Sequence, residues 1–249
     1  MSFIEARNIS KTFGDIRAVE GLSLSVEKGE MFGLVGSDGA GKSTFLRMVA
    51  TMIPPTDGGI TIGGRDVVTS RDDIKRMIGY MPQRFGLYQD LTVGENMDFF
   101  MDIFGVSGAE RRARKKRFLA FSNLSPFVDR LAGNLSGGMK QKLGLACVLV
   151  HQPEVLILDE PTNGVDPVSR KEFWDILFQM KRDGMTILIS TAYLDEGEKC
   201  DRIALMHNSR VIDSGNPAVI RGDMPDLEEA IIHRIQQFDR DLAHDSFKF

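Results

Sequence analysis

Residues Gly36–Thr44 read GSDGAGKST and match the pattern G-x-x-x-x-G-K-[ST] at every fixed position. The apolar run MFGLV at 31–35 precedes them and predicts a short buried strand. Residues Lys42–Met52 predict a helix that stops before Pro54 and Pro55. Because the pattern requires a strand before it and a helix after it, the stretch predicts a phosphate-binding loop in an α/β fold. The alternative is a glycine-rich turn that only happens to precede a helix.

The residue types in this loop suit a nucleoside triphosphate. Gly36, Gly39 and Gly41 allow backbone amides to turn inward and approach phosphate oxygens closely. The helix that follows adds the partial positive charge of its N-terminus. Lys42 can reach the β- and γ-phosphates, and the hydroxyl of Ser43 can bind Mg²⁺.

A second apolar run, VLILDEP at Val155–Pro161, predicts a buried strand that ends in two carboxylates. Strand alternation sends the side chains of Asp159 and Glu160 in different directions. We therefore assign Asp159 to the Mg²⁺ that Ser43 binds, and Glu160 to polarising the attacking water. The alternative is an acidic pair that only caps the turn into Pro161.

The remaining segments predict one α/β domain with an insertion. Residues 19–26 alternate apolar and small polar side chains, as a half-buried antiparallel strand does. Residues 93–150 predict several helices and no strand, and from Val155 strands and helices alternate again. We expect a P-loop NTPase core with a mainly parallel sheet, an N-terminal antiparallel β-subdomain and an inserted α-helical subdomain. The expected boundaries are 1–224 for the domain, with the core at 1–83 and 151–224 and the helical subdomain at 84–150, then 225–249 for a C-terminal helix and tail.

Composition narrows the class of protein. The 249 residues are 42% hydrophobic and carry a formal net charge of -4, which argues against nucleic acid as the main partner. Two distant cysteines, Cys147 and Cys200, form neither a disulfide framework nor a zinc motif and fit a reducing compartment. The opening residues MSFIEARNIS carry charges where a signal peptide needs an apolar core, and no run reaches the ~18 to 20 apolar residues of a membrane span. We therefore expect a cytoplasmic protein.

A further motif carries a family resemblance. LSGGM at Leu135–Met139 is similar to the LSGGQ signature of ATP-binding cassette (ABC) ATPases. Phe13 stands where that family has an aromatic residue stacked on adenine, Gln83 matches the glutamine that joins core to helical subdomain, and residues 163–166 match the loop after the catalytic strand. The resemblance covers nearly the whole chain. Met139 departs from the family's glutamine and resembles the drug- and polysaccharide-export branches.

The resemblance implies an ATPase that works as a pair. The helix that opens at Ser136 would contact the γ-phosphate of ATP held by another subunit, in a head-to-tail homodimer or heterodimer with a second ABC ATPase domain. Such a chain would drive a separate integral membrane subunit, as a peripheral protein on the inner face of the cell membrane, with ATP and Mg²⁺ as cofactors. The implied site residues are Glu160 and Gln83 for catalysis, Ser43, Gln83 and Asp159 for the metal, and Phe13, Gly36, Ser37, Asp38, Gly39, Ala40, Gly41, Lys42, Ser43, Thr44, Ser136, Gly137, Gly138 and Asp166 for the nucleotide.

Other interpretations stay open from the residues alone. One is a soluble ABC ATPase without a membrane partner, although such proteins usually have two cassettes or coiled-coil arms, and this chain has neither. The basic run ERRARKKR at Glu110–Arg117 could contact nucleic acid or anionic lipid, or simply form a solvated helix face.

Ala192 raises a further alternative. In the family a histidine follows this last strand and contacts the γ-phosphate and the catalytic glutamate, whereas a methyl group can neither donate nor accept a hydrogen bond. His207 lies well downstream, and we do not expect it to substitute. The chain is then either a regulatory subunit with weak hydrolysis or a branch in which Glu160 and a bound water suffice.

We predict that the substitution Ala192→His keeps or raises ATP turnover in the assembled complex, because it restores a donor beside an otherwise complete set of residues. The steady-state rate of phosphate release checks this. A large loss of turnover would mean that the pocket has been rebuilt around the methyl group.

Overall fold

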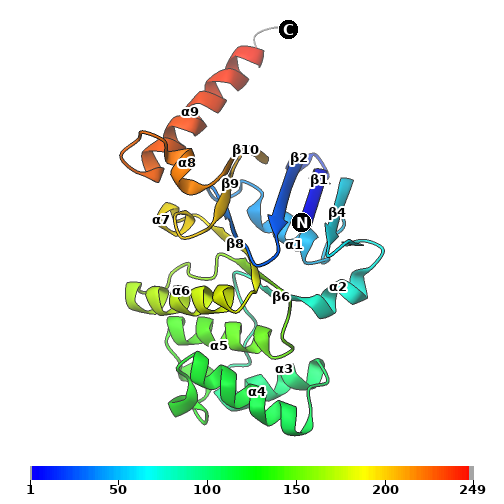
Figure 1. Cartoon of the computed structure of the whole chain (residues 1–249), viewed down its shortest axis with the longest axis vertical. Coiled ribbons are helices and arrows are strands. Elements are labelled where there is room, and N and C mark those ends of the chain that lie inside the picture. Colours follow the sequence, from blue (N-terminus) through cyan, green and yellow to red (C-terminus); the bar gives the residue numbers. More distant parts are fainter. Residues whose placement is uncertain (1, 247–249) are drawn as a thin grey trace. The chain divides into compact units, whose positions relative to one another are not determined.

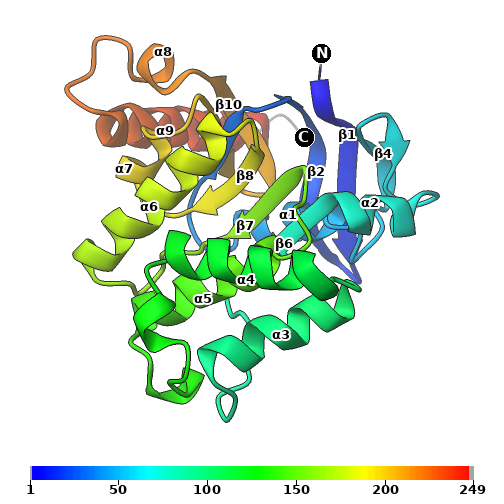
Figure 2. The same cartoon turned by 60° about the horizontal axis from the view of Figure 1, so that its bottom comes forward.

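The computed structural model describes residues 2–246, and the chain forms two compact units. The first unit contains the residues up to Ile74 together with those from Thr186 onward, and the second is Lys75–Met185. Figures 1 and 2 show the secondary-structure elements of each unit.

An antiparallel sheet forms the N-terminal part of the first unit. Its strand order is β2-β1-β4-β5, with β1 at Ser2–Phe13, β2 at Ile16–Glu27, β4 at Asp57–Ile62 and β5 at Arg65–Asp66. Strands β1 and β2 are long and lie side by side in both views (Figures 1 and 2). The predicted antiparallel subdomain is therefore confirmed, while the long first strand was not anticipated because charged residues interrupt its apolar pattern.

The other strands of the first unit carry the phosphate loop. β3 (Met31–Val35) pairs in parallel with both β8 (Thr186–Thr191) and β9 (Arg202–His207), and β10 (Arg210–Gly215) pairs antiparallel with β9. All five residues of β3 are buried, as its unbroken apolar run predicts. Val35 is in register with Thr191, so the loops after β3 and β8 leave the sheet at the same edge.

Helices of different lengths follow these strands. α1 spans Lys42–Val49 and ends earlier than the predicted Met52, because Thr51 takes a left-handed conformation with φ 60°. The backbone N–H of Thr51 donates to the carbonyl oxygen of Met48 (N···O 3.1 Å), and this bond terminates the helix well before the prolines. The remaining helices of the first unit are α7 (Leu194–Gly197), α8 (Pro217–Arg221) and α9 (Leu227–Ser246). Helix α2 (Arg71–Met77) contains the boundary between the two units.

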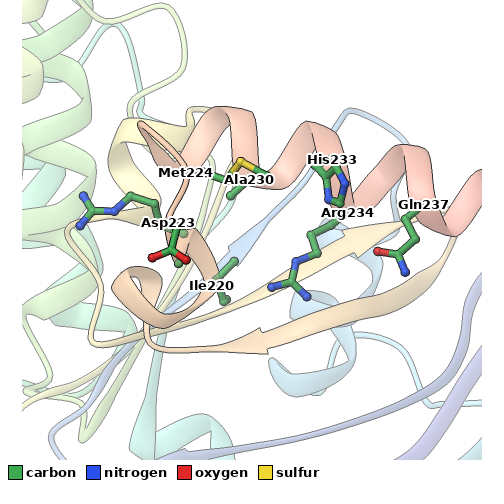
Figure 3. Close-up of a pocket in the computed structure, with 9 residues that line it drawn as sticks. Ile220, Asp223, Met224, Ala230, His233, Arg234 and Gln237 are labelled. Carbon is green, nitrogen blue, oxygen red and sulfur yellow. The ribbon is translucent and has the colours of Figure 1, made fainter.

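Helix α9 packs against the end of the first unit through Leu227, Ala230 and Ile231, which are buried. Arg234 of α9 forms an ion pair with Asp213 of β10 (Nη1–Oδ2 3.0 Å). A pocket of about 350 Å³ lies between α8, the loop after it and α9, and Figure 3 shows the side chains that line it. Within residues 2–246, no helix is long and apolar enough to span a bilayer.

The second unit begins with a pair of parallel strands. β6 (Ile78–Met81) pairs with β7 (Val155–Asp159), and all five residues of β7 are buried. Met81 is in register with Leu158, so the segment that carries Gln83 leaves β6 beside the end of β7.

Helices fill the rest of the second unit, as predicted for 93–150. The first of them, α3, starts with a capping box in which Thr92 and Glu95 bond reciprocally. The helices are α3 (Val93–Ile103), α4 (Gly108–Phe121), the 3₁₀ turns η1 (Ser125–Phe127) and η2 (Ala132–Asn134), α5 (Gly137–Leu149) and α6 (Pro167–Arg182).

The basic run lies on α4 and is partly neutralised by acidic residues of α3. Arg111 bonds to Asp98 (Nε–Oδ1 3.1 Å) and to Asp102. Lys115 also contacts Asp98 (Nζ–Oδ2 2.5 Å). Part of the basic run therefore joins α4 to α3 within the second unit.

Candidate functional site

The phosphate loop of the first unit folds around the side chain of its own lysine. Lys42 is 3% exposed, and its ammonium group donates to the backbone carbonyls of Gly36 (2.7 Å) and Ser37 (3.0 Å). A buried ammonium needs such acceptors, since desolvation without partners is costly. The loop is therefore curved around the cation.

Two glycines of this loop have a steric requirement. A Cβ at Gly36 would lie 2.2 Å from the carbonyl oxygen of Met206 in β9. A Cβ at Gly41 would lie 2.3 Å from the carbonyl oxygen of Ala18 in β2, and Gly41 has φ 102°. By contrast, Gly39 needs glycine only for its φ of 79°, because a Cβ there would meet no described atom within 4 Å.

Gly41 is also the N-cap of α1 and has no side chain to accept from the first amides of the helix. Those N–H groups and the helix dipole make this terminus suited to an anion. Ser43 lies in the first turn of α1 and is partly buried. The remaining residues assigned to this loop, Ser37, Asp38, Ala40 and Thr44, lie at or beside the same helix start.

Phe13 ends β1 with 48% of its surface exposed, and the ammonium of Lys11 lies 5.0 Å from its ring centroid.

After β8, the hydroxyl of Thr191 donates to Glu196 (2.6 Å) and accepts from the backbone N–H of Tyr193 (3.0 Å). Ala192 is exposed at the centre of this turn.

His207 ends β9, and its Nε2 lies 2.9 Å from Oδ1 of Asp239 in α9. This contact directs the imidazole of His207 to the C-terminal helix.

In the second unit, the two carboxylates at the end of β7 have different partners. Asp159 is 1% exposed, and the hydroxyl of Tyr80 in β6 lies 3.5 Å from its Oδ2. Glu160 is 7% exposed, and its Oε2 accepts from the amide of Gln83 (2.9 Å) and from that of Asn163 (3.3 Å). The structure thus brings Gln83 and Glu160 into direct contact.

Sequence reasoning missed two of these contacts. We expected residues 163–166 to form a loop but did not link Asn163 to Glu160, and we assigned no role to Tyr80. The signal for Asn163 is its position three residues after Glu160, where a turn can bring the chain back. Tyr80 is in register with Ile157 of β7, a pairing that the sequence does not specify.

The signature motif forms the start of α5. The Ser136 hydroxyl caps this helix by accepting from the backbone N–H of Met139 (3.3 Å). A Cβ at Gly137 would meet no described atom within 4 Å, whereas one at Gly138 would lie 2.2 Å from Cβ of Ser169 in α6. The two glycines therefore differ: Gly137 leaves open space, and Gly138 permits helix packing.

Asp166 caps the start of α6. Its Oδ1 accepts from the backbone N–H groups of Val168 (3.1 Å) and Ser169 (2.9 Å). The backbone hydrogen bond from Ser169 is the main reason that the pKa of Asp166 lies below its ordinary value. Lys142 of α5 bonds to Glu172 of α6 (2.6 Å), so an ion pair joins the two helices.

The comparisons with known proteins agree with this fold, which is that of a P-loop NTPase of the ATP-binding cassette type. A family model described as ABC transporter matches residues 19–163. The chain therefore belongs to the ABC transporter family.

Its relatives include the "Probable multidrug ABC transporter ATP-binding protein YbhF" of Escherichia coli, 47% identical over 210 residues, which are 84% of this chain and 36% of that protein. The chain thus spans about a third of that relative's length. The "Nod factor export ATP-binding protein I" of Burkholderia lata is 41% identical over 215 residues, which are 86% of this chain and 71% of that protein.

Solved structures are similar as well. A structure named "ATP binding subunit of ABC transporter" has a TM-score of 0.84 and 29% identity, and the match covers 94% of this chain and 99% of that one. The ATP-binding cassette MJ0796, a dimer in a post-hydrolysis state with ADP and Pi, has a TM-score of 0.77 and 27% identity, over 86% of this chain and 98% of that one.

We predict that Gly138→Ala lowers the free energy of unfolding by about 1 to 3 kcal/mol, because the new methyl group would overlap Ser169. Gly137→Ala is the matched control one residue earlier on the same helix. It should be neutral or slightly stabilising, since its methyl group meets open space and alanine favours a helix. Chemical denaturation of both variants checks this, and equal effects would contradict the packing role of Gly138.

Proposed function

We propose that this chain is the ATP-binding and ATP-hydrolysing subunit of an ABC exporter. The observation that carries the proposal is the carboxylate of Glu160, which two amides hold at the end of a buried strand in a chain with a complete phosphate loop. The export function is supported by relatives named for multidrug and Nod factor export.

The first step is binding of ATP by the phosphate loop. The amides at the start of α1 and the ammonium of Lys42 would contact the β- and γ-phosphates, in part by exchanging the lysine's bonds to the Gly36 and Ser37 carbonyls for bonds to phosphate. The exposed ring of Phe13 would stack on adenine. The surrounding loop residues would contact phosphate mainly through their backbone.

Magnesium fits the proposed donor set. Ser43 of the first unit and Asp159 and Gln83 of the second would supply a hydroxyl, a carboxylate and an amide oxygen, which are hard oxygen ligands of the kind Mg²⁺ takes. Gln83 uses its N–H on Glu160, which leaves its carbonyl oxygen for the metal. When bound, the ion would offset charge on the phosphates.

Hydrolysis then requires a water molecule aligned with the γ-phosphorus. In the proposed mechanism, Glu160 accepts a hydrogen bond from this water and takes its proton as the new P–O bond forms. The bond between the γ-phosphorus and the bridging oxygen breaks, and ADP leaves with the electron pair. The products are ADP and inorganic phosphate.

The proposed mechanism also requires a second cassette. The start of α5, with Ser136, Gly137 and Gly138, would meet the γ-phosphate of ATP in the partner copy, and Asp166 would lie at the same interface. The dimeric MJ0796 cassette supports such pairing. The pair, as a homodimer or heterodimer, would act on an integral membrane subunit from the cytoplasmic face of the membrane.

We predict that Glu160→Gln lowers the rate of phosphate release by about a hundredfold or more while ATP still binds, because the amide cannot take the proton. Phosphate release and nucleotide binding are measured on the full-length chain for both proteins. Indistinguishable release rates would contradict an enzymatic role and favour the regulatory subunit suggested by Ala192.

A further inference from the structure

Glu160 has a backbone conformation that few side chains adopt. Its φ of 48° lies in the left-handed region, and Pro161 follows directly. Left-handed conformations are unfavourable for a residue with a Cβ, and such strain collects at functional sites. Contacts of the neighbouring residues must therefore hold Glu160 in place.

Asn163 makes two of those contacts. Its backbone N–H donates to the carbonyl oxygen of Glu160 (3.2 Å) and closes a tight turn. Its side-chain amide returns over the same turn and donates to Oε2 of Glu160 (3.3 Å). One residue thus holds both the backbone and the carboxylate of Glu160.

Gln83 donates to the same carboxylate oxygen, but from a different part of the chain. It lies in the segment after β6, outside the turn that carries Glu160. The bond from Asn163 is local, because donor and acceptor are three positions apart in the sequence, so it does not depend on where the segment with Gln83 lies.

The chemistry of these donors suits an orienting role. Both are neutral amides, which can fix the plane of a carboxylate without cancelling its charge. A lysine or arginine at residue 163 would instead form an ion pair and compete with a proton from water.

We propose that Asn163 is a positioning residue for Glu160: its amide keeps the carboxylate turned toward the attacking water. This inference rests on the proposed function, since it assigns Asn163 to the hydrolysis step. Asn163 acts through Glu160 and does not itself need to contact the nucleotide.

The test compares Asn163→Asp with Asn163→Ser in the full-length chain. The aspartate keeps the shape but replaces the donor with a second carboxylate, so kcat for ATP hydrolysis should fall about tenfold to a hundredfold, as expected for loss of a hydrogen bond to a charged group. The KM for ATP should stay within about twofold, because loss of an interaction that acts only in the transition state lowers kcat and leaves substrate binding unchanged. The serine keeps a donor and should recover part of kcat.

Asn123→Asp is the matched control. Asn123 is an exposed asparagine of the same unit with φ 56°, and it lies in the turn after α4. It undergoes the same change of charge and should leave kcat and KM unchanged.

Two outcomes would overturn the inference. One is a kcat for Asn163→Asp within about twofold of the unsubstituted chain. The other is a rise in KM or a fall in melting temperature that accounts for the lost activity in both Asn163 variants, which would make the residue structural. Failure of the proposed function looks different, because the unsubstituted chain would then release phosphate no faster than Glu160→Gln.

Discussion

One buried cation organises the phosphate loop. The ammonium of Lys42 is almost excluded from solvent and takes carbonyl oxygens of the loop as partners, so the backbone must curve closely around it. That curvature brings the loop against β9 and β2, where only glycine fits at residues 36 and 41. The close approach of the neighbouring strands and the curved backbone of the loop therefore both depend on glycine at residues 36 and 41. A side chain added at either glycine would disturb both.

The register of the parallel strands determines where the polar residues at the strand ends lie. Within the first unit Val35 of β3 is in register with Thr191 of β8, and within the second Met81 of β6 is in register with Leu158 of β7. Parallel pairing carries the carboxyl ends of each pair to the same edge of that pair. Polar residues follow those ends: the phosphate loop and Thr191 in one unit, and Gln83, Asp159 and Glu160 in the other. In the second unit α5 and α6 add a rigid pair, joined by Lys142 and Glu172 and by the close contact at Gly138. Both helices of this pair start at a capping side chain, Ser136 for α5 and Asp166 for α6.

Much of this could be predicted from sequence because the signals are local. Five-residue apolar runs mark β3 and β7, and the loop motif itself names Lys42 and Ser43. What could not be predicted depends on contacts distant in sequence or on backbone conformation. The early end of α1 follows from the left-handed Thr51, and the need for glycine at residue 138 follows from Ser169 on another helix. The bond from Asn163 to Glu160 depends on a turn that the motif alone does not specify.

We propose that ATP held by the Lys42 loop of one copy is clamped by the Ser136 helix of another. The most direct test is the mass of the full-length chain in solution, measured by analytical ultracentrifugation with Mg²⁺ and ATP after hydrolysis has been blocked by Glu160→Gln. We expect a two-cassette particle that forms with ATP and dissociates without it, either from the chain alone or with its natural companion subunits. A chain that binds ATP and yet stays monomeric under both conditions would exclude this pairing.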